Sequence, residues 1–230
     1  MTDKTEALLF SFFSSLKPAA ISLPDSIILS CHNIPFSDTV RNLGFILDSE
    51  LSMTKHIIKI CQTAYFELKH ISSIRRFLTE DATKTLVTSY ILSWLDYCNC
   101  LLMGAPNSLI QPLQKVQNFG ARLILRAPRY HHSTPHLKKL HWLPISERIE
   151  YKVTCMCFYA MNGSGPTYLY QLLHIYTPSR TLRSFSNSRM VKIQQYKRKT
   201  HGFRTFTYFG PYVWNSLPHD IKQCCTPSLF

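Results

Sequence analysis

The spacing of apolar residues constrains the fold of this chain more than any other feature of its sequence. Apolar side chains recur three and four positions apart over residues 57–74, again over 86–98, and again over 113–124. Such spacing gives a helix one continuous apolar face, which a globular chain buries against other helices. The three segments therefore predict a small helical bundle over residues 53–126.

Local signals predict where these and later helices begin and end. Thr79, followed by two acidic residues, is typical of a capped helix start. The Gly-Ala-Pro-Asn sequence at 104–107 predicts a break before the third helix, with its Asn as the cap. Pro144 fits the first turn of a further helix that ends at Asn-Gly 162–163, and Pro166 fits the start of a short one.

The N-terminal part of the chain has the composition of short strands. Segments 5–13, 27–31 and 40–47 are short and apolar, and Gly44 permits a bend in the third. Three short strands leave open sheet edges, so this sheet would be marginal by itself. We therefore expect a mainly α fold of the α+β class with a small N-terminal sheet.

The excess of positive over negative charge is confined to the second half of the chain. Residues 1–110 carry 9 Lys and Arg against 10 Asp and Glu, whereas residues 111–230 carry 17 against 3. A hydrophobic fraction of 45% with 17% charged residues is typical of a globular chain rather than a disordered one. The net charge of +13 and its asymmetry indicate a polyanionic partner, either nucleic acid or an anionic membrane surface.

The third predicted helix has a cationic face opposite its apolar face. Lysine and arginine on such a face neutralise a phosphate backbone, whereas the alternative is an ordinary solvated surface. A second basic segment follows at 177–204, with one strand predicted at 191–195. The candidate nucleic-acid-binding residues of both segments are Lys115, Arg122, Arg126, Arg129, Lys138, Lys139, Arg180, Arg183, Lys197, Arg198, Lys199 and Arg204.

Aromatic residues interleave with these cations and indicate contacts to unpaired bases. Rings beside cations stack bases while the cations bind phosphates. The alternative is packing in a core, which is the better interpretation of Trp142 and Trp214. The interleaved aromatic residues are Tyr130, Trp142, Tyr196, Phe203, Phe206, Tyr208 and Phe209.

The sequence contains no recognisable cofactor or metal motif. Neither the cysteine pairs at 98/100 and 155/157 nor the histidines between 131 and 141 have the spacing of a zinc site. Pro135 argues against a helix that brings His132 and His136 onto one face. Phosphate-binding glycine motifs and a GxSxG elbow are also missing. We expect no metal, no cofactor and no small-molecule substrate, and thiols that are reduced and mostly buried.

No apolar run in the sequence reaches the roughly 18 residues that span a bilayer. The apolar segment 8–16 is similar to the core of a signal peptide, but Asp3 and Glu6 before it oppose the positive bias that such a leader needs. We expect an intracellular chain, nuclear or cytoplasmic, that is neither secreted nor inserted in a membrane.

Four sequence segments carry a resemblance to a known family. They are LQKVQNFGARLI from 113, RYHHSTPHLKKLHWLPISERIEYKV from 129, PSRTLR from 178 and VWNSLP from 213. Together they closely resemble the C-terminal part of LINE-type (non-LTR) retrotransposon reverse transcriptases, over nearly the whole chain. The resemblance implies a partial palm at 1–52, whose other strands lie upstream, a thumb at 53–126 and a basic region at 127–230.

The resemblance also implies a polymerase without its catalytic centre. Reverse transcriptases hold two metal ions with an aromatic-x-Asp-Asp sequence, which this chain lacks. Glu80 and Asp81 are adjacent, but helix capping accounts for them, and Lys4 corresponds to a palm lysine that assists pyrophosphate departure. We expect no enzymatic activity, and sequence-independent binding of RNA or an RNA–DNA duplex. The alternatives are a helical module or inert relic that meets an acidic protein, and polymerase activity only with a separately encoded palm.

Overall fold

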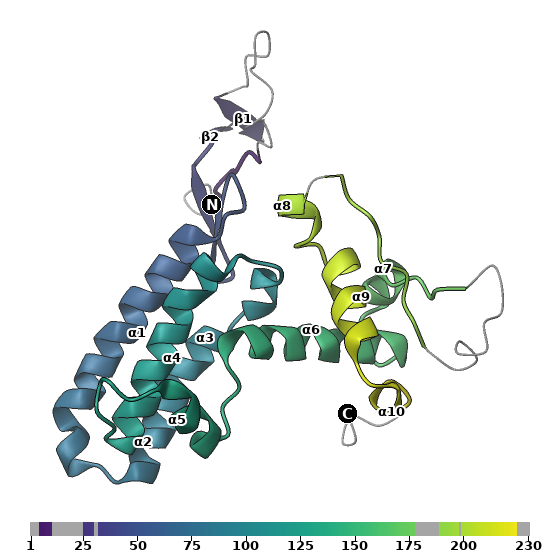
Figure 1. Ribbon diagram of the computed structural model, residues 1–230. Helices are drawn as coiled ribbons and strands as arrows, with labels where there is room; N and C mark the ends of the chain where they lie inside the picture. Colours follow the sequence, from purple (N-terminus) through teal and green to yellow (C-terminus); the bar gives the residue numbers. More distant parts are fainter. Residues whose placement is uncertain (1–4, 11–24, 30–31, 178–188, 198, 225–230) are drawn as a thin grey trace. The chain divides into compact units, whose positions relative to one another are not determined.

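The computed structural model describes residues 5–10, 25–29, 32–177, 189–197 and 199–224. The chain divides into two compact units, Met1–Leu78 and Thr79–Phe230, and each is considered by itself (Figure 1). The fold is mostly helical with a few short antiparallel strands, which confirms the predicted mainly α class. The division at residue 78 differs from the predicted boundaries at 52 and 126, since the first long helix packs with the strands of the first unit.

Two β-hairpins supply the strands of the first unit. β1 (Ser26–Leu29) pairs antiparallel with β2 (His32–Pro35), and β3 (Thr39–Asn42) pairs antiparallel with β4 (Phe45–Asp48). The prediction of a single bent strand over 40–47 is therefore wrong, and β2 is an element that the sequence analysis does not predict. The described part of the predicted strand 5–13 is also not a strand, because it forms only one isolated bridge.

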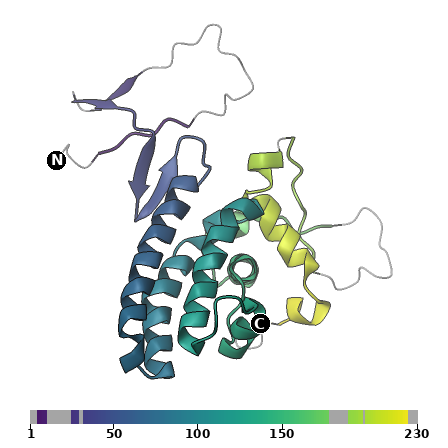
Figure 2. The same cartoon turned by 60° about the vertical axis from the view of Figure 1, so that its left-hand side comes forward.

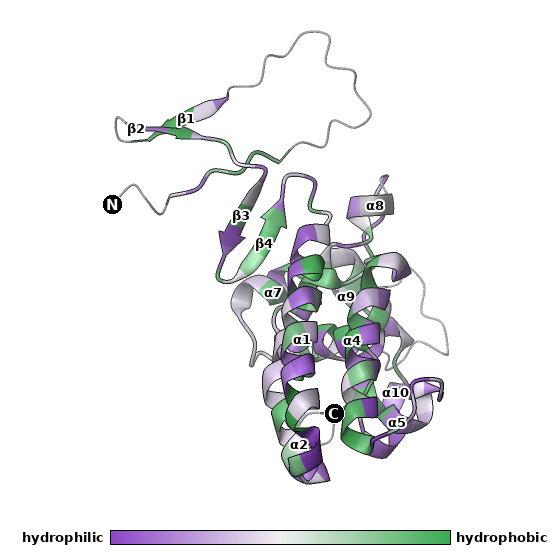
Figure 3. Ribbon diagram, turned by 90° about the vertical axis from the view of Figure 1, so that its left-hand side faces the viewer, coloured by the Kyte–Doolittle hydropathy of each residue, from purple (hydrophilic) through white to green (hydrophobic). Residues whose placement is uncertain are grey.

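A two-residue turn explains why the strand prediction over 40–47 is wrong. Leu43 and Gly44 both have positive φ, 47° and 89°, as in the tight turns whose twist suits a hairpin. Leucine is uncommon in this conformation, so the sequence gives little warning of the turn. Figure 3 shows β4 as hydrophobic and β3 as largely hydrophilic. Phe45 of β4 is accordingly buried.

Helix α1 (Thr54–Ile74) follows β4 through a loop that Asp48 holds (Figure 2). The Asp48 carboxylate accepts hydrogen bonds from the Ser52 amide at 2.6 Å and from the Met53 amide at 2.9 Å. His56 is buried beneath the hairpin, and its Nδ1 accepts a hydrogen bond from the Ile46 amide at 3.3 Å. The apolar stripe predicted for this helix is confirmed by the buried residues Ile57, Cys61, Ala64, Leu68 and Ile71.

The regular elements in the described part of the second unit are helices and helical turns, and one isolated bridge joins Ile175 to Val191. A short 3₁₀ turn in the first unit, η2 (Arg75–Phe77), precedes the second unit. The helices and helical turns of the second unit are α2 (Glu80–Val87), η3 (Thr88–Leu92), α3 (Ser93–Asp96), η4 (Asn99–Leu102), α4 (Asn107–Leu125), α5 (Ser133–Leu140), α6 (Ile145–Met161), α7 (Thr167–Leu172), α8 (Lys199–Gly202), α9 (Phe206–Ser216) and α10 (His219–Lys222).

The second apolar stripe does not form one uninterrupted α-helix. Thr79 caps α2 as predicted, because its hydroxyl oxygen accepts a hydrogen bond from the Ala82 amide at 3.2 Å. The π-helical turn η3 then widens the helix before α3, which ends at Asp96 with Tyr97 in an extended conformation, and Cys98 precedes η4 with a φ of 52°. Ile91 and Leu95 are still buried, so the stripe predicts the buried side but not the change of helix type.

Helices α4 and α5 pack against each other and are joined by a short turn. Asn107 is the first residue of α4 rather than its cap, since Pro106 takes the cap position without a side-chain hydrogen bond. The argument from Pro135 against a helix is wrong as well. Pro135 lies in the first turn of α5, where the missing amide hydrogen has no partner to lose.

Two glutamine side chains of α4 attach it to the start of α6. Gln117 is fully buried, and its Nε2 donates to the Leu143 carbonyl oxygen at 2.9 Å. The Gln114 Oε1 accepts a hydrogen bond from the Ile145 amide at 2.8 Å, which satisfies one of the free donors at the α6 terminus. Pro144 precedes α6 as its cap residue instead of lying in the first turn.

A separate core joins α6 to α7 and α9 (Figure 1). Trp214 is fully buried there, and its indole Nε1 donates to the Arg189 carbonyl oxygen at 2.7 Å. The Asn215 side chain forms two hydrogen bonds with the Val191 backbone, at 2.8 and 3.0 Å. The strand predicted at 191–195 is reduced to the single bridge at Val191, because side chains of α9 take its backbone groups.

Candidate nucleic-acid interface

The α4–α5 segment places four cations on the surface. Leu137 and Leu140 of α5 are buried, each 5% exposed. Lys138 and Lys139 lie between them in the helical repeat, so both side chains face away from the core and are exposed. Lys115 on α4 and Arg129 in the connecting turn are exposed too. We call Lys115, Arg129, Lys138 and Lys139 the α4–α5 basic surface.

Two further arginines of α4 shape the turn that leads to α5. Arg122 is half-buried, and its Nη1 donates to the Ser133 Oγ at 2.8 Å. This bond ties the first residue of α5 to the last turn of α4. Arg126 ends α4 in the left-handed region with a φ of 50°, and its side chain is exposed. Arg122 therefore has a structural contact that the sequence analysis does not predict.

Carboxylates are missing from this part of the sequence. Residues 97–146 contain no Asp or Glu, and the preceding Asp96 forms ion pairs with Arg148 and Lys152 of α6. Among the described residues, no carboxylate forms an ion pair with any member of the α4–α5 basic surface. Lys138 and Lys139 lie in the last turn of α5, where the helix dipole favours positive charge.

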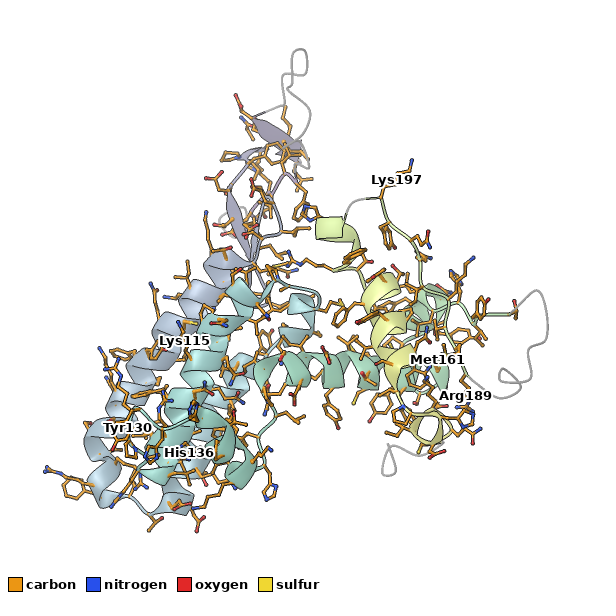
Figure 4. The ribbon with its side chains drawn as sticks, viewed as in Figure 1. Lys115, Tyr130, His136, Met161, Arg189 and Lys197 are labelled. Carbon is orange, nitrogen blue, oxygen red and sulfur yellow. The ribbon has the colours of Figure 1, made fainter. Side chains whose placement is uncertain are left out.

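The turn between α4 and α5 projects an aromatic ring. The His131 amide donates to the Pro128 carbonyl oxygen at 3.2 Å, which closes the turn. Tyr130 within it is 84% exposed. Its ring meets the His131 ring edge to face at a centroid distance of 5.0 Å, and His131 stacks on His136 at 6.3 Å. Figure 4 shows Tyr130 and His136 at the same end of the helices, with Lys115 further along α4.

The other predicted basic residues lie elsewhere or outside the described residues. Lys197 is exposed beside α8, and Arg204 is half-buried between α8 and α9. Lys199 belongs to α8. The structure therefore places the six candidates from Lys115 to Lys139 in α4, α5 and the turn between them. Lys197, Lys199 and Arg204 lie in a second segment around α8. Lys4, Arg180, Arg183 and Arg198 lie outside the described residues.

Three further basic residues near α9 are not among the candidate binding residues. Arg189 and Lys192 belong to the predicted basic segment 177–204 and are exposed, and Arg189 donates to the Asn162 Oδ1 at 3.1 Å. Lys222 is instead buried, where desolvation lowers the pKa of its ammonium group. Its Nζ donates to the Asn215 carbonyl oxygen at 2.8 Å. Basic residues near α9 thus divide between surface and core, which composition does not reveal.

Most of the aromatic candidates are engaged within the protein. Trp142 and Trp214 are buried as expected, at 9% and 0% exposure. Phe206 and Phe209 pack against the α6–α9 core. Phe203 stacks on Tyr208 at a centroid distance of 4.4 Å. The Tyr196 hydroxyl lies 2.5 Å from the Thr207 Oγ1. Tyr130 is the most exposed of the seven candidates.

The described cysteines form no disulfide and show no sign of activation. Burial raises the pKa of Cys61 to about 11 and that of Cys157 to about 12, so both are protonated thiols near neutral pH. Within the described ranges, no three His, Cys, Asp or Glu side chains come together as metal ligands. His132 and His136 lie at the start of α5, but in the described part of the chain they do not belong to any group of three His, Cys, Asp or Glu side chains that could hold a metal ion.

Comparisons with known proteins give no match: no family model, no curated protein and no solved structure is similar enough to this chain. In the described part of the chain, no helix is both long enough and apolar enough to cross a membrane.

Proposed function

We propose that this chain binds RNA or an RNA–DNA duplex independently of sequence through the α4–α5 basic surface. The observation that carries the proposal is the exposure of four cations in a segment without a carboxylate. Exposed cations without carboxylate partners attract a phosphate backbone, which releases counterions when they bind it. Such binding is sensitive to salt and nearly blind to base sequence.

The side chains beside these cations support contact with phosphates rather than with base edges. Asn and Gln read adenine through bidentate hydrogen bonds. Three amides near Lys115 on α4, Gln114, Gln117 and Asn118, are bonded to one another or to the backbone before α6. They are thus engaged in holding the fold, which leaves Gln111 as the exposed amide beside Lys115 on this helix.

The family resemblance supports the choice of RNA or an RNA–DNA duplex over other polyanions. We propose that the chain is a catalytically incomplete relative of a non-LTR retrotransposon reverse transcriptase, with α1–α4 in the place of a thumb. The sequence contains no adjacent aspartates to hold the metal ions of polymerisation. The proposed role is therefore retention of the nucleic acid without chemistry on it.

The test compares two variants with the same reduction in charge. The first replaces the α4–α5 basic surface, as Lys115→Ala, Arg129→Ala, Lys138→Ala and Lys139→Ala together. The second replaces four exposed lysines outside it, as Lys55→Ala, Lys59→Ala, Lys69→Ala and Lys84→Ala. Fluorescence anisotropy would follow binding to two RNA–DNA duplexes of unrelated sequence over a range of salt concentrations.

We expect the first variant to bind both duplexes more weakly and to an equal extent. The slope of log affinity against log salt should fall by up to about 4 units, at roughly 0.9 for each phosphate that the variant no longer neutralises. The second variant should keep most of the slope. Equal weakening in both variants would show that net charge alone matters. Weakening on one duplex only would indicate a sequence-specific reader, and no binding by the unmodified chain would favour an acidic protein partner.

A further inference from the structure

Tyr130 differs from the other aromatic residues near the cations because its ring is 84% exposed. Other tyrosines of the second unit are exposed as well, such as Tyr168 at 60%, but none of those described is as exposed as Tyr130. Tyr151, at 55%, also has a cation beside it, but that cation, Lys152, is bonded to Asp96. Tyr130 directly follows Arg129 of the α4–α5 basic surface. An apolar ring with a cation beside it is the pairing that holds unpaired nucleotides.

The protein holds this ring in position from one side. The hydrogen bond between the Pro128 carbonyl and the His131 amide fixes the turn, and the Arg122–Ser133 bond fixes the start of α5 behind it. The His131 ring stacks on the His136 ring with an interplanar angle of 13°. On its other contact it meets the Tyr130 ring edge to face, at an interplanar angle of 78°. A ring with 84% exposure and one supporting contact keeps a face open to a ligand.

Little ordering would be needed when a base stacks on a ring that is already placed. The turn is short, and α5 anchors it through Leu137 and Leu140, which are both buried. Preorganised contacts bind more tightly because less conformational freedom is given up on binding. The neighbouring Arg129 is exposed and has no described carboxylate partner, so it remains available for the phosphate of the same nucleotide.

We propose that Tyr130 is a stacking site for one unpaired base beside the α4–α5 basic surface. The chain then prefers a nucleic acid with a single-stranded extension over a fully paired duplex, since paired bases are stacked on each other and offer no free face. This inference rests on the proposed function, because the cations hold the backbone while Tyr130 selects the unpaired nucleotide.

The test uses the full chain and two probes. One is a blunt RNA–DNA duplex, and the other is the same duplex with a short single-stranded extension that carries 2-aminopurine, whose fluorescence is quenched by stacking. The variants are Tyr130→Ala, Tyr130→Trp and, as a matched control, Tyr168→Ala on α7. Circular dichroism would verify that each variant keeps its helices, and the exposure of both tyrosines makes unfolding an unexpected outcome.

The unmodified chain should bind the extended probe about 5- to 100-fold more tightly than the blunt one, the range that stacking of a single base supplies. Tyr130→Ala should abolish this advantage and the quenching, while affinity for the blunt duplex stays the same. Tyr130→Trp should retain both, and Tyr168→Ala should behave like the unmodified chain.

Three results would overturn the inference, and they are distinguishable. If the unmodified chain binds both probes equally and with a normal salt slope, the proposed function stands and the stacking site is wrong. The same conclusion follows if Tyr130→Ala weakens both probes equally or leaves the advantage intact. If neither probe binds at any salt concentration, the proposed function fails, and the stacking site fails with it.

Discussion

The buried glutamine between α4 and α6 gives the sharpest prediction about stability. Gln117 is fully buried, donates to the Leu143 carbonyl oxygen and accepts from the Gln114 Nε2, each at 2.9 Å. Gln117→Leu keeps most of the volume but leaves the Leu143 carbonyl oxygen without its side-chain donor, whereas the Gln114 Nε2 keeps its hydrogen bond to the Asn118 Oδ1. An abandoned buried polar group costs about 1–3 kcal/mol, so we expect the free energy of unfolding to fall by that amount. Gln117→Ala also opens a cavity and should cost about 2–5 kcal/mol.

Tryptophan fluorescence suits the measurement, because all three tryptophans, Trp94, Trp142 and Trp214, belong to the second unit. Urea unfolding followed by this signal reports on the unit that contains Gln117. Thermal unfolding should show a Tm roughly 2–10 °C lower for Gln117→Leu. Gln111→Ala, an exposed position on the same helix, is the control and should change the stability by less than about 0.5 kcal/mol.

One result would refute the reasoning about this network. If Gln117→Leu unfolds at the same urea concentration as the unmodified chain or a higher one, apolar packing at this position outweighs the two hydrogen bonds. If Gln117→Ala is less stable than the unmodified chain while Gln117→Leu is not, the whole loss of unfolding free energy comes from the cavity and not from the lost hydrogen bonds.

Two other predictions concern the first unit and catalysis. Burial lowers the pKa of His56 from its ordinary value of 6.5, so the unfolded chain binds more protons than the folded one between the two pKa values. The stability that neutral His56 contributes is present above about 6.5 and is lost as the pH falls from there through the lowered pKa of the folded chain. Exchange of the Ile46 amide, which donates to the His56 Nδ1, should therefore accelerate below this pH relative to His56→Gln, and an identical pH dependence in both proteins would contradict the prediction. The purified chain should also incorporate no nucleotide on primed RNA with magnesium or manganese, because it lacks the adjacent aspartates; template-dependent incorporation above a blank preparation would disprove this.

Helices were predictable from the sequence where one apolar stripe decides the structure. The stripes of α1 and α4 predict both the helices and their buried sides, because burial of a continuous face dominates their energetics. The sequence does not predict the structure where the backbone angles of a few residues determine it. The β3–β4 turn has leucine at a positive φ, and the π turn η3 leaves the apolar spacing unchanged. Gly44 predicts a bend in the first case but not a two-residue turn with Leu43 at positive φ, and the π turn has no local sequence signal.

The candidate site shows the same division. Exposure of Lys115, Lys138 and Lys139 follows from helical spacing alone, since buried residues lie on the other side. The bond from Arg122 to Ser133 and the projection of Tyr130 depend on the path of the turn after α4. That path is set by the left-handed backbone at the end of α4 and by the packing of α5, which spacing does not encode.

The residues that end α4 and α5 have left-handed backbone conformations, which lower the stability of this segment. Arg126 and His141 close their helices with φ of 50° and 57°, a conformation in which glycine avoids a penalty of about 1 kcal/mol or more for other residues. A chain selected for thermal robustness alone would gain from glycine at both places. Keeping an arginine and a histidine there sacrifices stability in a segment that carries no acidic residue. Replacing Arg126 with glycine to stabilise the end of α4 would therefore also remove one positive charge from this segment.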